Sequence, residues 1–167
     1  PAPAARAATW TVTNGNDSGS GSLRQAITNA APGDTITFTA DYTITLGSQL
    51  DISKNLTLDG ETHHIILSGN NAVRVFSVNA GITFNLSNLT VANGNVSGGN
   101  GGGISNAGTL NVTNSTFSGN RAGGTGSGGG IYNTGTLNVT NSTFSGNNAG
   151  YYGGGIYSLG TVTVINS

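Results

Sequence analysis

The residues best suited to catalysis or metal binding lie together in the segment Asp59-Gly60-Glu61-Thr62-His63-His64. Two carboxyl groups could act as general acid and base, and carboxylates with imidazoles could bind a metal ion. However, adjacent side chains on a strand point to opposite faces, which argues against joint chelation by the two histidines. Asp59-Gly60 is also typical of a turn, with the histidines on a loop beside it. We therefore predict no catalytic residue, no metal site and no cofactor.

The distribution of charge supports this interpretation. The 167 residues include only five Lys or Arg and six Asp or Glu, and the formal net charge is -1. All six carboxylates lie at or before Glu61, so the later part of the chain has none for acid/base chemistry. The near-neutral charge offers no basic surface for nucleic acid, and the absence of Cys excludes thiolate sites. No apolar run approaches the roughly 20 residues of a membrane span.

Tyrosines are the second group of candidates, and their chemistry is that of binding. Tyr132 and Tyr157 each follow an Ile at the same point of successive repeats, and Tyr151 and Tyr152 precede Tyr157 in a loop. Exposed aromatic rings can stack on sugar rings or anchor a protein partner. Alternatively, stacked tyrosines can serve only to stabilise the pairing of neighbouring strands. We select these four residues as the candidate binding site, for a glycan or a cell-surface partner.

An internal repeat must position these candidates. The stretch from Gly108 to Asn120 recurs letter for letter from Gly135, and a third copy begins at Gly160. Leu and Val alternate with Thr and Asn in each copy, which is typical of a half-buried strand. The copies begin 27 and then 25 residues apart. A repeat of 25–27 residues with strand-like content predicts a solenoid of short strands, each paired with its equivalent in the next turn. Stacking would then produce ladders of Ile104, Ile131 and Ile156, of Phe117 and Phe144, and of Asn114 and Asn141 at a corner where amides bond along the axis.

The segment before the repeats has a different organisation. Leu23, Ala26, Ile27 and Ala30 have the spacing of an amphipathic helix, and strands are expected at 9–13, 35–38, 42–46, 50–52 and 55–58. The helix is suited to cover the first turn, whose bare edge would otherwise promote aggregation. We divide the chain into 1–8, a processed or flexible N-terminus; 9–60, the first strand, the capping helix and the first turns; and 61–167, the repeats with an incomplete last turn.

Two sets of motifs resemble those of known protein families. The runs Gly21-Ser-Leu-Arg-Gln-Ala-Ile27 and Pro32-Gly-Asp-Thr-Ile-Thr-Phe38 resemble the N-terminal segment of secreted proteins with a CSLREAI motif, with Gly21 and Gln25 in place of its Cys and Glu. The Gly-Gly-Gly-Ile and Phe-Ser-Gly-Asn runs are similar to the GGA[ILV] and FxxN repeats of polymorphic outer-membrane proteins. The resemblance implies an all-β fold, a right-handed single-stranded parallel β-helix, which is secreted or displayed on the cell surface and often adhesive.

These observations favour a secreted or cell-surface β-helix with a structural or adhesive role and without catalysis. Two alternatives stay open. One is a carbohydrate-binding or polysaccharide-degrading β-helix, and the other is a subunit that stacks end to end into a filament through its uncapped last turn. Outward rows of Thr and Asn, such as Asn111 and Thr113, also suggest ice binding, although the solvated face of any β-helix needs similar residues, and we favour that simpler interpretation.

Overall fold

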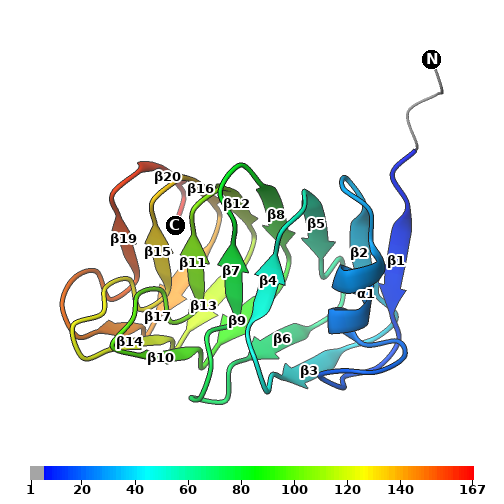
Figure 1. Cartoon of the computed structure of the whole chain (residues 1–167), viewed down its shortest axis with the longest axis horizontal. Coiled ribbons are helices and arrows are strands. Elements are labelled where there is room, and N and C mark those ends of the chain that lie inside the picture. Colours follow the sequence, from blue (N-terminus) through cyan, green and yellow to red (C-terminus); the bar gives the residue numbers. More distant parts are fainter. Residues whose placement is uncertain (1–5) are drawn as a thin grey trace.

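Short parallel strands wind along residues 6–167, the part of the chain that the computed structural model describes, and form a right-handed β-solenoid (Figure 1). The predicted fold class is therefore confirmed. Most of the proposed processed N-terminus, residues 1–5, lies outside the described residues. Among residues 6–167, no helix has the length and apolar character needed to cross a membrane.

The strands belong to four parallel sheets, and from β8 onward each turn visits sheets A, B, D and C in that order. Sheet A contains β1 (Thr9–Val12), β2 (Thr35–Phe38), β5 (Leu56–Asp59), β8 (Thr83–Ser87), β12 (Thr109–Thr113), β16 (Thr136–Thr140) and β20 (Thr161–Ile165). Sheet B contains β3 (Tyr42–Thr45), β6 (Ile65–Ser68), β9 (Thr90–Ala92), β13 (Thr116–Ser118) and β17 (Thr143–Ser145). Sheet C contains β4 (Leu50–Ile52), β7 (Phe76–Val78), β11 (Ile104–Asn106), β15 (Ile131–Asn133) and β19 (Ile156–Ser158). Sheet D contains β10 (Asn95–Ser97), β14 (Arg121–Gly123) and β18 (Asn148–Ala149).

Alternation of apolar and polar residues explains how each strand faces the core. In β12 and β16 the Leu and Val residues are buried, whereas the Thr and Asn residues between them are half-buried on the outside. In sheet C, Ile104 pairs with Ile131 and Ile131 with Ile156. In sheet B, the Phe117 and Phe144 rings stack with centroids 4.9 Å apart and planes 8° from parallel. The one-to-one register keeps like residues in contact, so the core is a set of continuous apolar columns.

The single helix among the described residues, α1 (Leu23–Asn29), lies at the β1 end of the solenoid (Figure 1). The Ser22 side chain accepts a hydrogen bond from the Gln25 backbone N–H, 3.2 Å, which caps its first turn. Leu23, Ala26 and Ile27 are buried in the core. The helix therefore lies where the spacing of its apolar residues predicted, between β1 and β2 in the chain.

Asparagine side-chain amides hydrogen-bond to one another between turns at several positions, the predicted corner among them. Asn114 and Asn141 do stand in one corner column, each with the left-handed φ that turns the chain, 48° and 49°. At this corner the side-chain amide of Asn114 donates a hydrogen bond to Asn88 Oδ1, 3.3 Å. Shorter hydrogen bonds between side-chain amides lie elsewhere. On the inside, Asn106 donates to Asn133, 2.6 Å, and Asn120 donates to Asn147, 2.9 Å. On the outside, Asn111 donates to Asn85, 2.7 Å, and Asn138 donates to Asn111, 2.8 Å.

Candidate functional site

The four candidate tyrosines come together in one stack. Tyr132 of β15 pairs with Tyr157 of β19, and their ring centroids are 5.8 Å apart with planes 17° from parallel. Tyr152 stacks on Tyr157 at 5.7 Å and 12°, and Tyr151 tilts against Tyr152 at 4.1 Å and 53°. Three rings thus follow one another nearly in parallel, and a fourth closes the row. We call this group the tyrosine platform.

The loop that carries Tyr151 and Tyr152 is held against the preceding turn. The Tyr151 N–H donates to the Gly126 carbonyl, 3.0 Å, and the Tyr152 N–H donates to the Ser127 hydroxyl, 3.3 Å. The Tyr152 carbonyl in turn accepts from the Gly128 N–H, 2.8 Å. These contacts fix the backbone although the rings are open to solvent, with Tyr151 65% and Tyr152 51% exposed. The platform is therefore both accessible and ordered before any ligand arrives.

The chemistry of the platform is that of neutral aromatic faces. Hydrogen bonding with Tyr151 raises the pKa of Tyr152 above its ordinary value, and desolvation adds to the effect. The Tyr152 hydroxyl therefore stays protonated at neutral pH. Aromatic faces with a hydroxyl at the edge suit a ligand that has both C–H faces and hydroxyl groups, such as a sugar ring.

A polar row continues the platform along sheet C. The outward residue on successive strands is Asp51 on β4, Ser77 on β7 and Ser105 on β11, in register with Tyr132 on β15. At about 4.8 Å per strand, Asp51 lies about 14 Å from Tyr132 along the axis. An extended ligand parallel to the axis would therefore meet aromatic rings at one end and hydroxyl and carboxylate groups at the other.

Beside the far end of this row lies a hollow of about 310 Å³ that includes Arg74. The Arg74 guanidinium donates to Gln49 Oε1, 2.8 Å, and the Gln49 amide donates to Asp51 Oδ1, 2.7 Å. Arg74 also donates to the carbonyls of Asn100 and Gly101. Desolvation lowers the pKa of Arg74 and the nearby Asp51 opposes this shift. Because the Arg74 guanidinium is hydrogen-bonded to Gln49 in the preceding turn and to Asn100 and Gly101 in the following one, Arg74 joins adjacent turns to each other.

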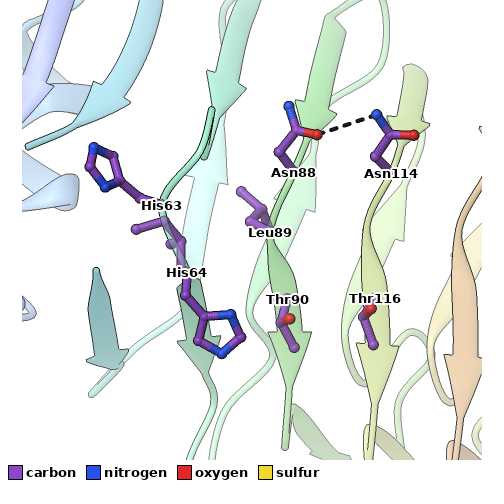
Figure 2. Close-up of a pocket in the computed structure, with 8 residues that line it drawn as sticks. His63, His64, Asn88, Leu89, Thr90, Asn114 and Thr116 are labelled. Atoms are coloured by element: carbon purple, nitrogen blue, oxygen red, sulfur yellow. Dashed lines mark hydrogen bonds between the residues drawn. The ribbon is translucent and has the colours of Figure 1, made fainter. Parts of the chain in front are cut away.

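His63 and His64, at the end of the Asp59 to His64 segment, line a second hollow of about 320 Å³ (Figure 2). The rings of His63 and His64 point in different directions from the chain (Figure 2). His63 Nδ1 lies 3.6 Å from Asp41, whose carboxylate also accepts from the His64 N–H. Asp59 accepts from the Glu61 N–H and from the Asn88 amide, so it shapes the turn.

These groups do not converge on one point. Among residues 6–167, no three side chains of His, Asp or Glu are grouped so that they could hold a metal ion. Besides the two histidines the hollow is lined by Ile65, Asn88, Leu89, Thr90, Asn114 and Thr116. Its polar side chains are therefore imidazoles, amides and hydroxyls, with no carboxylate among them.

Sequence reasoning missed the polar residues that face inward. Asn106, Asn120 and Asn133 are all 1% exposed or less, although the alternation rule places Asn outside. The Asn120 side-chain amide donates hydrogen bonds to the Val91 carbonyl and to Asn147 Oδ1, and so connects three turns. Their recurrence at equal spacing, Asn106 with Asn133 and Asn120 with Asn147, is the signal that could have revealed them.

Comparison with known families identifies a match over most of the chain. The family model described as "Putative pectate lyase-like adhesive domain" matches residues 9–123, more than half of the chain and all of the segment from β1 to β14. A search of curated proteins finds no match to the chain. The parallel solenoid and the family match together lead to one conclusion: this chain belongs to the pectate lyase-like adhesive domain family.

Proposed function

We propose that this chain is a non-catalytic adhesive β-helix that acts outside the cell and binds glycans through the tyrosine platform. The observation that carries the proposal is the stack of Tyr132, Tyr157 and Tyr152, with ring centroids 5.7–5.8 Å apart. Its family is described as adhesive, and its N-terminal motif resembles that of secreted proteins. Aromatic rings held in place before binding cost a ligand little ordering entropy.

Binding to a glycan array tests the platform. We expect the wild-type chain to bind neutral glycans and Tyr152→Ala to bind them about 2- to 10-fold more weakly, the range that corresponds to ~0.5–1.5 kcal/mol of aromatic stacking. Tyr152→Phe keeps the ring and is the matched control, so it should retain most of the affinity. No binding of the wild-type chain to any glycan would overturn the proposal, and so would equal binding by Tyr152→Ala.

The absence of catalysis has its own test. Incubation of the chain with a panel of acidic and neutral polysaccharides should produce no new reducing ends. Product formation that disappears in Asp59→Ala or His63→Ala would instead establish a polysaccharide-degrading enzyme. This outcome would contradict our proposal even if the tyrosines also bind glycans.

The outermost strand of sheet A favours a second candidate, end-to-end self-association. On β20, Val162, Val164 and Ile165 are 41%, 47% and 50% exposed. β1 lies at the opposite end of the same sheet, so β20 of one copy could pair with β1 of the next. Light scattering over a range of concentrations tests this candidate, because a mass that stays that of one chain would exclude it.

A further inference from the structure

The outer face of sheet A is a regular two-dimensional array over its last four strands. β8, β12, β16 and β20 pair residue for residue at all five positions. Three outward columns result: Thr83, Thr109, Thr136 and Thr161; Asn85, Asn111, Asn138 and Thr163; and Ser87, Thr113, Thr140 and Ile165. None of these twelve side chains carries a charge or an aromatic ring. We call this surface the Thr/Asn face.

The face repeats at two fixed intervals. Equivalent residues on neighbouring strands are about 4.8 Å apart, and alternate residues on one strand are about 6.7 Å apart. Glycines before the strands keep the turns this close, since a Cβ on Gly135 would collide with the Gly108 carbonyl oxygen. The array is therefore a grid of hydroxyl, methyl and amide groups with nearly constant spacing.

The side chains of the grid are also held in place. The central column is an amide ladder in which Asn111 donates to Asn85, 2.7 Å, and Asn138 donates to Asn111, 2.8 Å. Side-chain ladders of this kind are among the features that keep a sheet from twisting. The flanking Thr residues are β-branched and have few χ1 rotamers. A ligand that matches the grid would meet it already ordered.

The composition of the face decides which ligands suit it. Protein interfaces concentrate their binding energy in aromatic and Arg residues, and nucleic acids require basic ones, so neither partner is favoured. A single glycan chain would be bound better by the tyrosines of sheet C. A rigid, uncharged grid of hydroxyls, amides and methyls matches a surface that itself repeats in two directions and exchanges hydrogen bonds. The exposed planes of ice repeat their water positions at comparable intervals.

The residue-for-residue register of these columns outweighs the simpler interpretation of a merely solvated face, and we propose that the Thr/Asn face binds the surface of ice. The methyl groups of Thr would sit between water positions of the lattice, while the hydroxyls and the free amide N–H groups would hydrogen-bond to it. This function is separate from glycan binding, because the face lies on sheet A and the tyrosine platform on sheet C with the loop before it.

Partition between growing ice and liquid water tests the proposal. Labelled wild-type protein should be incorporated into a slowly growing ice front, whereas an unrelated globular protein should be excluded. Thr109→Lys places a long charged side chain in the middle rows of the grid and should reduce incorporation several-fold. The matched control is Thr116→Lys, which makes the same change in the same turn on the outer side of sheet B and should leave incorporation unchanged.

The two variants also keep the test free of folding effects. Circular dichroism and the melting temperature should be the same for Thr109→Lys and Thr116→Lys, because both residues are half-buried and face outward. Exclusion of the wild-type chain from ice would overturn the proposal, as would equal incorporation of the two variants. Capture by powdered crystalline cellulose or chitin without incorporation into ice would overturn it in favour of a crystalline polysaccharide. Tyr152→Ala should be incorporated like wild type, so failure of glycan binding and failure of ice binding are distinguishable.

Discussion

Replacement of Asn120 by Ala should destabilise the fold more than any outward Asn substitution. Asn120 is 0% exposed, and its side chain joins three turns. Its Oδ1 accepts from the Gly94 N–H, 2.8 Å, while its Nδ2 donates to the Val91 carbonyl and to Asn147 Oδ1, both 2.9 Å. Asn120→Ala removes all three bonds and leaves the buried Gly94 N–H without its side-chain acceptor.

The magnitude follows from these contacts. The two hydrogen bonds that Asn120 Nδ2 donates, at ~1 kcal/mol each, total about 2 kcal/mol. The desolvated Gly94 N–H adds to this, because a buried donor without a partner costs ~1–3 kcal/mol. We therefore expect the free energy of unfolding to fall by about 3–5 kcal/mol.

Asn111→Ala is the matched control. Asn111 lies in the same repeat and also belongs to an amide ladder, but it is half-buried and faces outward. Water can replace its lost partners, so we expect a loss below about 1 kcal/mol.

Urea titration followed by circular dichroism measures both variants, and the dependence of the free energy on urea should stay constant. Amide hydrogen exchange at Gly94 gives a local readout, with faster exchange expected in Asn120→Ala only. If the two variants lost stability equally, the difference between inner and outer ladders on which the reasoning rests would be refuted.

Three further predictions concern the core, pH and the turns. Phe117→Ala should cost about 3–5 kcal/mol, measured by thermal melting, because a fully buried ring is lost from its column. The pKa of Asp34 lies below its usual value because the carboxylate accepts hydrogen bonds from the backbone N–H groups of Ala8 and Ala31 and from the Trp10 indole. This carboxylate therefore stabilises the fold at pH values above its ordinary pKa, and the stabilisation is lost as pH falls through the lowered pKa. Asp34→Asn should accordingly flatten the acid limb of a stability–pH curve, and an unchanged limb would contradict this. Gly135→Ala should lower the melting temperature, since its Cβ would collide with the neighbouring turn.

Much of the candidate site could be predicted from the repeat. Tyr132 and Tyr157 occupy equivalent places in successive copies, and in a solenoid equivalent places become neighbours. Tyr151 and Tyr152 have no counterpart in the preceding turn, so periodicity did not place them. Their position in the stack depends on hydrogen bonds between two glycine-rich loops, with Gly126 and Ser127 on the earlier one.

Local sequence also predicted most element boundaries to within one residue. The strand expected at 42–46 is observed as Tyr42–Thr45, and the one expected at 55–58 as Leu56–Asp59. The differences fall at corners, where turn geometry decides whether a residue still pairs with the next turn. The inward Asn residues are a larger failure. Asn120 lies at a corner between β13 and β14, which alternation does not describe, whereas Asn106 and Asn133 end strands on the inward side, where an apolar residue is expected.

The sequence by itself therefore determined the solenoid and the apolar columns, because repeats of nearly constant length stack like on like, and it also showed that no carboxylate follows Glu61. The tertiary structure alone decided which side chains meet around a turn. It brought Tyr152 onto Tyr157 and turned Asn120 into the core. It also aligned the uncharged columns of sheet A into a grid. The physical reason is that spacing along the chain specifies neighbours along the axis, whereas neighbours across a corner depend on backbone angles and on the packing of loops.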